Sequence, residues 1–177
     1  MSAERYTVLQ KLLHWTVALA VIGALAGGTA IDWLSNGPLK NQVYALHKAT
    51  GILILGLMLL RLVLRVVHGA PALPLAVPAW QRTAAAASHF LLYALLLLMP
   101  FVGWAATSAF PAPIPFFGLF DVPPLIGKDR ALSEQLFEIH HFMGNAIIAL
   151  IVIHVGAALQ HALIKKDGVF QRMWFGS

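Results

Sequence analysis

The sequence predicts an all-α membrane protein, a bundle of four transmembrane helices with both termini in the cytoplasm. Three observations support this prediction. Hydrophobic residues make up 59% of the 177 residues and charged residues only 11%, against about 25% in ordinary soluble domains. Four apolar segments are long enough to cross a hydrocarbon core of about 30 Å. Lysine and arginine residues gather in alternate connecting segments, as they do in multi-pass proteins.

The four predicted spans are residues 12–34, 45–67, 84–109 and 142–164. Turn-forming residues separate them: Ser35 to Pro38 follow the first span, and groups of prolines follow the second and the third. Pro100 lies inside the third span and is expected to kink it. The first apolar run, about twenty residues, exceeds the 7 to 15 of a signal peptide core, so we expect a retained helix. Residues 1–177 are therefore predicted to form one integral membrane domain, without internal repeats.

The distribution of basic residues predicts the orientation. With the N-terminus in the cytoplasm, eight of the twelve basic residues flank cytoplasmic helix ends: Arg5, Lys11, Arg61, Arg65, Arg82, Lys165, Lys166 and Arg172. The other four lie on the outer side: Lys40, Lys48, Lys128 and Arg130. The net charge of +5 is then explained by topology and by contact with anionic lipid, so we predict no nucleic-acid partner.

The sequence contains no cysteine, which restricts the cofactors that the chain can hold. Disulfides, thiolate-ligated iron–sulfur clusters, zinc ribbons and covalently attached c-type haem are excluded. Eight histidines remain as the main soft ligands.

Four histidines form two pairs at matching depths. His14 and His154 lie near the predicted cytoplasmic ends of their helices, and His47 and His140 lie near the outer ends. On a helix, the fourteen residues from His140 to His154 span about 21 Å and return to within roughly 40° of the same face. Zinc or di-iron carboxylate sites lack ligands here, whereas haem needs one imidazole on each side of its plane. We therefore predict two b-type haems; the alternative is interfacial histidines bonded to carbonyls or headgroups, but ionisable groups inside membranes are usually functional.

Neighbouring residues are compatible with a large flat cofactor. Gly51 and Gly144 lie four residues after His47 and His140, on the same helix faces, where a missing side chain leaves room for a macrocycle. The alternative is ordinary helix packing through small residues. His141 points about 100° away from its neighbour and is not expected to be a ligand.

Arg61 and Arg65 lie one turn apart at the depth of the inner histidine pair. They are candidates to pair with haem propionates. The alternative is that their side chains extend to lipid headgroups.

Several motifs resemble the bacterial cytochrome b561 family. They are the run Leu12 to Trp15, the run His47 to Gly51 followed by Arg61 to Arg65, and the segment His140 to His154. The resemblance covers nearly the whole chain and implies a dihaem protein of the bacterial inner membrane, with His14, His47, His140 and His154 as iron ligands. One branch of this family is similar to a superoxide oxidase, which passes electrons from superoxide to ubiquinone. Other members serve as subunits of hydrogenases or formate dehydrogenases. The motifs do not separate these branches, and the loop from Phe110 to Glu134, rich in proline and phenylalanine, differs from the family.

The predicted function is transmembrane transfer of single electrons, in a respiratory chain, between an outer donor such as superoxide and ubiquinone. His161 continues the face of His154, and His89 begins the third span at a similar depth, so we predict that they approach each other and bind a quinone, to which histidine can supply protons. Interfacial histidines are again the alternative. Two other functions stay open: a cytochrome b anchor subunit of a membrane dehydrogenase or hydrogenase, and a non-haem transporter lined by histidines.

Overall fold

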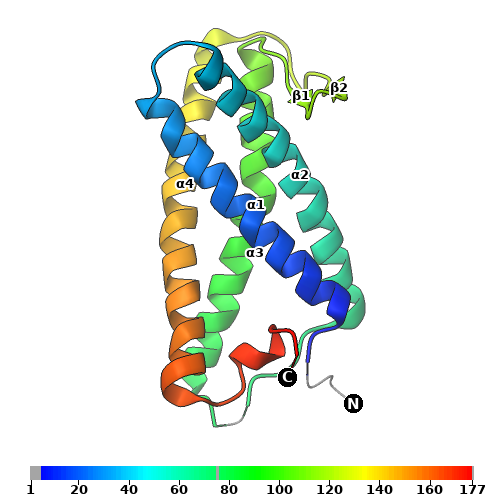
Figure 1. Ribbon diagram of the computed structural model, residues 1–177, viewed down its shortest axis with the longest axis vertical. Coiled ribbons are helices and arrows are strands. Elements are labelled where there is room, and N and C mark those ends of the chain that lie inside the picture. Colours follow the sequence, from blue (N-terminus) through cyan, green and yellow to red (C-terminus); the bar gives the residue numbers. More distant parts are fainter. Residues whose placement is uncertain (1–4, 75, 177) are drawn as a thin grey trace.

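The computed structural model describes residues 5–74 and 76–176, and four long helices dominate it (Figure 1). They are α1 (Val8–Trp33), α2 (Pro38–His68), α3 (Ala79–Ala109) and α4 (Arg130–Leu159). Each is long and apolar enough to cross a membrane, with mean hydropathies between 1.6 and 2.2. The prediction of a four-helix membrane bundle is confirmed.

Both chain ends lie at the same end of the bundle (Figure 1). We call it the terminal end; α1 and α3 begin there, and α2 and α4 run toward it. The opposite end, where α2 and α4 begin, is called the loop end. The assignment of the terminal end to the cytoplasm stays a prediction from the distribution of basic residues.

The helices extend beyond the apolar spans that the sequence predicted. At the start of α1, Thr7 and Gln10 form a capping box, which satisfies backbone N–H groups of the first turn. Asp129 caps α4 by accepting a hydrogen bond from the Leu132 N–H at 3.0 Å, so this helix begins at Arg130 rather than near residue 142. Hydropathy detects the apolar part of a helix and misses the polar helical turns at its ends. Pro100 lies within α3, which continues to Ala109.

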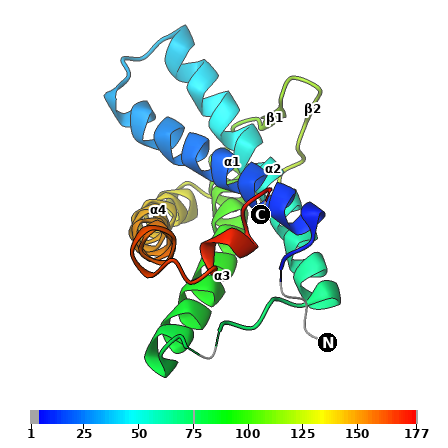
Figure 2. The same ribbon diagram turned by 60° about the horizontal axis from the view of Figure 1, so that its bottom comes forward.

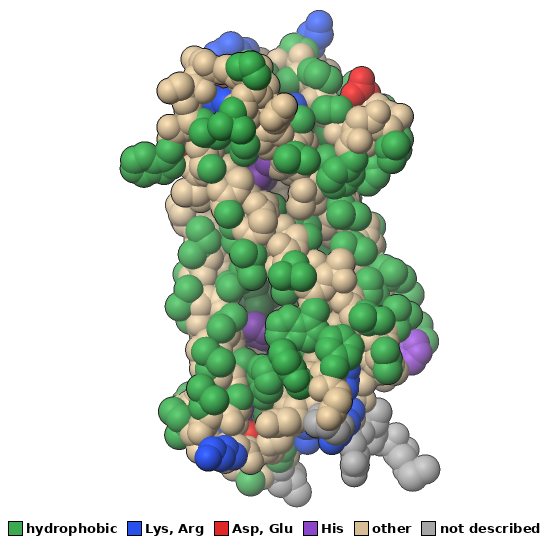
Figure 3. All heavy atoms as spheres, in the orientation of Figure 1, with side chains coloured by type: hydrophobic (Ala, Val, Ile, Leu, Met, Phe, Trp, Pro, Cys, Tyr) green, Lys and Arg blue, Asp and Glu red, His purple; other side chains and the backbone are tan. Residues whose placement is uncertain are grey.

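Most close backbone contacts between helices are made by helices that are adjacent in sequence, whereas α1 and α4 meet mainly through side chains. Figure 2 shows α4 standing apart from α1 when the bundle is viewed toward the terminal end. The most buried core lies at mid-height and consists of Val17, Val21, Ile54, Met58 and Ile147. The outer surface is largely hydrophobic (Figure 3), as expected for a surface that faces lipid.

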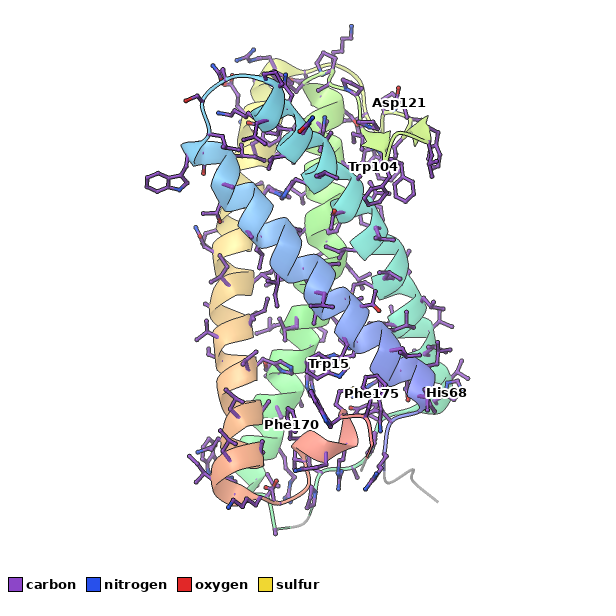
Figure 4. The ribbon with its side chains drawn as sticks, in the orientation of Figure 1. Trp15, His68, Trp104, Asp121, Phe170 and Phe175 are labelled. Atoms are coloured by element: carbon purple, nitrogen blue, oxygen red, sulfur yellow. The ribbon has the colours of Figure 1, made fainter. Side chains whose placement is uncertain are left out.

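Two segments outside the helices were not predicted from the sequence. At the loop end, β1 (Pro115–Phe116) and β2 (Phe120–Asp121) form an antiparallel hairpin between α3 and α4. At the terminal end, α4 continues as a π-helix, Gln160–Lys165, and the chain then folds under the bundle through the 3₁₀-helix Phe170–Arg172 (Figure 4). The Trp15 indole N–H donates to the Met173 carbonyl at 3.1 Å, which fastens this segment to α1.

Candidate functional site

Each of the four long helices carries two site residues that are fourteen residues apart. The pairs are His14 and Gly28 in α1, His47 and Arg61 in α2, His89 and Gly103 in α3, and His140 and His154 in α4. Fourteen residues advance a helix by about 21 Å and return it to nearly the same face. The eight residues therefore form two layers: a loop layer (Gly28, His47, Gly103 and His140) and a terminal layer (His14, Arg61, His89 and His154). Figure 3 shows histidine side chains at two heights on the viewed face of the bundle.

In the loop layer, His47 and His140 face each other across the bundle. Their ring centroids are 6.0 Å apart, with the planes at 76°. His47 Nδ1 lies 2.9 Å from the Ala24 carbonyl, so this nitrogen carries the proton and donates it, and Nε2 is left as an unprotonated ligand. His140 Nδ1 is buried and has no hydrogen-bond partner in the described part of the chain. An unpaired buried nitrogen is costly, which is typical of a binding site rather than of a packed core.

Two glycines allow the rings of this layer to lie against helix backbones. A Cβ at Gly28 would lie 3.0 Å from His47 Cε1, and a Cβ at Gly103 would lie 2.9 Å from His140 Cε1. The sequence had predicted Gly51 and Gly144 for this role. Gly51 does line the cavity between the two histidines, whereas a Cβ at Gly144 would make an ordinary contact with Met99.

The cavity between His47 and His140 is otherwise almost entirely apolar. Val21, Ala24, Leu25, Ile54, Leu96, Met99, Pro100 and Ile147 complete its lining. It reaches from the loop layer to the buried core, since Val21, Ile54 and Ile147 belong to both. An apolar wall with two converging imidazoles is the lining that a flat, hydrophobic macrocycle with a central metal requires.

The terminal layer contains three imidazoles. The His14 and His154 ring centroids are 6.3 Å apart, with the planes at 59°, and the His89 and His154 centroids are 5.5 Å apart. Arg61 Nη2 lies 3.1 Å from His14 Nδ1, and its guanidinium carbon lies 5.4 Å from the Tyr93 ring centroid. The depth-matched pair predicted from the sequence is thus formed, with His89 as an additional neighbour.

Arg65 lies beside this layer rather than in it, and its Nη1 donates to the Tyr6 hydroxyl at 3.0 Å. A small polar pocket joins the two arginines; Tyr6, Gln10, Arg61, Leu64, Arg65, Tyr93 and Met173 line it. Two guanidinium groups and two phenols suit an anionic group such as a carboxylate.

His161, the second predicted quinone residue, lies about 10 Å further along the helix than the terminal layer. Its Nδ1 is 2.6 Å from Asp167 Oδ2, in the turn that follows the π-helix. Burial would raise the pKa of Asp167, but hydrogen bonds from His161 and from the Val169 N–H hold it below its usual value. The structure therefore places His89 against His154, and His161 against Asp167.

The imidazole pairs fit a shared iron. If two imidazole nitrogens each lay about 2.0–2.1 Å from one metal, and each ring centroid ~1.2 Å beyond its nitrogen, the centroids would be separated by about 6.4–6.6 Å. The observed separations of 6.0 and 6.3 Å are slightly shorter than this range, so small shifts of the rings would admit a shared metal. Among the described residues, no group of three or more His, Asp or Glu side chains is placed to hold a bare metal ion. Haem, which supplies the other ligands of its iron, fits the pairs.

The contact between Arg61 and His14 depends on which nitrogen of His14 carries the proton. An iron-bound Nε2 requires the proton to be on Nδ1, and a protonated Nδ1 cannot accept a hydrogen bond from the guanidinium. Arg61 would then need another acceptor, and a haem propionate is an anion that would accompany the iron. The assignment of Arg61 to haem propionates stays a prediction from the sequence.

The fold and site define a class: multi-pass helical membrane proteins with stacked imidazole pairs suited to b-type haem. Comparison with known proteins agrees, since residues 5–176 match the family model of prokaryotic cytochrome b561. Cytochrome b561 homolog 2 of Escherichia coli (strain K12) is 34% identical over 172 residues, 96% of this chain and 91% of that protein. Cytochrome b561 homolog 1 of the same organism is 31% identical over 174 residues, covering 96% and 97%. A probable superoxide oxidase CybB of Yersinia pestis is 27% identical over 172 residues, covering 96% of each chain.

The chain belongs to the prokaryotic cytochrome b561 family. It is a multi-pass bacterial membrane protein of the b-type cytochrome class, and its general activity is electron transfer in the membrane.

Proposed function

We propose that this cytochrome carries single electrons across the bacterial inner membrane through two b-type haems, from a donor on the outer side to ubiquinone. The observation that carries the proposal is the presence of two imidazole pairs in two layers of one bundle. His14 and His154 would ligate the iron of the terminal layer, and His47 and His140 that of the loop layer. When bound, each haem supplies a centre that accepts and releases one electron.

The chain's own residues set the environment of these centres. The Ala24 carbonyl fixes the tautomer of His47 and increases its basicity as a ligand. Gly28 and Gly103 let the loop-layer rings seat against the backbone. The apolar wall of the cavity keeps water away, and Arg61 with Arg65 supplies positive charge beside the terminal layer for propionates.

The proposed direction rests on charge at the two ends. With the terminal end in the cytoplasm, four basic residues on the outer side would attract a small anion: Lys40, Lys48, Lys128 and Arg130. Five acids on the same side weaken that field, and one of them, Glu134, pairs with Arg130. Superoxide is such an anion, and the similarity to a probable superoxide oxidase supports it as the donor. Fusions to a reporter that is active only outside the cytoplasm test the orientation: activity is expected near Pro38 and Lys128, and none near Pro74 or after Ser177. The opposite pattern of reporter activity would place the loop end in the cytoplasm and the terminal end outside.

The proposed quinone site uses His89 and His161. His89 belongs to the terminal layer and lies against His154, so electrons have a short path to it, and His161 has a carboxylate partner that keeps its ring oriented. His161→Ala and His89→Ala should slow oxidation of the reduced cytochrome by ubiquinone, while reduction by superoxide is largely retained. Wild-type quinone rates in both variants would remove these residues from the site.

Haem content is the decisive measurement. The purified protein should contain two haems that acidic acetone releases, because the sequence has no cysteine for covalent attachment. His47→Ala and His140→Ala should lose chiefly one haem, and the matched control His141→Ala should retain both. A stoichiometry near zero in the wild type would overturn the proposal. Superoxide:ubiquinone turnover by the isolated chain distinguishes an oxidase from an anchor subunit that needs a partner dehydrogenase.

A further inference from the structure

The hairpin at the loop end carries an exposed aromatic tip. The exposed fractions are 45% for Phe117, 77% for Leu119 and 58% for Phe120. The Phe116 and Phe120 rings stack at 5.2 Å, and the Phe116 and Phe117 rings meet edge to face at 5.0 Å. The tip is therefore one continuous apolar surface without a charged residue.

The turn of this hairpin is strained in a way that local structure does not explain. Phe117 and Gly118 have φ values of +50° and +76°, and the Leu119 N–H donates to the Phe116 carbonyl at 3.0 Å. The register pairs Phe116 with Phe120, so Phe117, Gly118 and Leu119 form the loop. Positive φ is unfavourable for a bulky side chain such as that of Phe117, and glycine or asparagine adopts it more readily. A phenylalanine there indicates that its ring is required for a contact outside the hairpin.

The hairpin is folded back along the flank of the bundle. Trp104 Nε1 donates to the Pro123 carbonyl at 2.9 Å, and Trp104 lies about 7–8 Å before the end of α3. Lys48 Nζ donates to the Pro113 carbonyl, and Lys48 lies about 15 Å inside α2. Both anchors are within helices that span the membrane, so the hairpin lies at interfacial depth rather than above the bundle.

The hairpin also projects sideways. Figures 1 and 2 both show β1 and β2 displaced from the bundle axis, beyond α2. In Figure 4, Asp121 lies nearer the loop end than Trp104 does. A lateral apolar tip at this depth adjoins the lipid-facing surface of α2.

We infer that the hairpin tip, Phe116 to Phe120, inserts into the boundary between headgroups and acyl chains of the adjoining leaflet and anchors the loop end to the lipid. Phenylalanine and leucine side chains on the apolar face of membrane-surface segments bury at this boundary. The anchor would hold the 110–129 loop against Lys48, which adjoins the ligand candidate His47. The inference does not depend on haem binding or on the electron donor.

The absence of cysteine makes a clean test possible. A spin label on Leu119→Cys, in vesicles of phosphatidylethanolamine and phosphatidylglycerol, reports its collisions with oxygen, which partitions into lipid, and with a water-soluble nickel chelate. Lys128→Cys is the matched control for water, and Val152→Cys, 66% exposed on α4, is the control for lipid. Because the tip is placed at the boundary and residue 152 lies deep in the apolar span, the oxygen-to-nickel ratio at residue 119 should lie between those at residues 128 and 152, clearly above the value for water.

Two results would overturn the inference. A ratio equal to that at Lys128 would mean that the tip faces water, as a docking surface for a soluble protein would. Shielding from both reagents would mean that protein, such as a second copy of the chain, covers it. Phe117→Asn in the Leu119→Cys background supplies an independent check: asparagine favours the turn, so the hairpin should persist while the ratio shifts toward the value for water. An unchanged ratio would show that Phe117 does not anchor the tip.

Discussion

Adding a single methyl group at Gly103 should weaken the haem binding that we propose for the loop layer. The new Cβ in Gly103→Ala would lie 2.9 Å from His140 Cε1, closer than real Cβ contacts, so either the ring or α3 has to move. A ring held by iron cannot move freely, and overpacking of this kind costs about 1–3 kcal/mol. If the cost falls on the haem-bound form, haem affinity should fall by about 5- to 150-fold.

The assay is transfer of haem to an excess of apomyoglobin, followed by absorbance, with one of the two proposed haems expected to leave faster. Gly56→Ala is the matched control, because this helical glycine is exposed and a Cβ there meets nothing within 4 Å. Alanine is favoured over glycine in a helix by about 1 kcal/mol, so the control should be as stable as the wild type or more stable. Equal release from Gly103→Ala, Gly56→Ala and the wild type would refute the reasoning.

Three further predictions concern the framework of the bundle. Ser133 is fully buried, and its hydroxyl donates to the Ala106 carbonyl at 3.0 Å; Ser133→Ala should lower the unfolding free energy by about 0.5–1.5 kcal/mol, measurable as a lower Tm in detergent. Because the pKa of Asp167 is held below its usual value, its contribution to stability is present above about pH 4 and is lost as pH falls through the lowered pKa, so the acid limb of a Tm–pH profile should be shallower in Asp167→Asn. Trp15→Phe removes the donor to the Met173 carbonyl and should increase proteolysis of the C-terminal segment, and unchanged cleavage would show that this bond does not fasten it.

The membrane spans and the histidine pairs were predictable because they depend on simple periodicities. An apolar run of twenty or so residues is uncommon outside membrane helices, and the fourteen-residue separation of His140 and His154 fixes a common face. The structure brings His14 to His154 and His47 to His140 as these patterns predict.

The missed features depend on contacts that no short pattern reveals. Gly28 and Gly103 resemble any small residue in a membrane helix until their fourteen-residue separation from His14 and His89 is noticed. The hairpin has Phe-Gly in its turn, where the usual signal is Asn-Gly. The contact between His161 and Asp167 was also missed, because a π-helix and the left-handed Lys166 join them across a turn whose path the sequence does not specify.

The two site residues of each long helix are fourteen residues apart on all four helices, so the distance between the two layers is fixed by helix geometry. Inserting one residue between the two layers of a helix would rotate one of its site residues by about 100° and shift it by about 1.5 Å, so that it would leave the layer. A whole number of turns has to be added to keep the face, which changes the separation in steps of at least ~5 Å. The other three helices would then be out of register with the altered one. The separation of the two layers can therefore change only if all four helices change together.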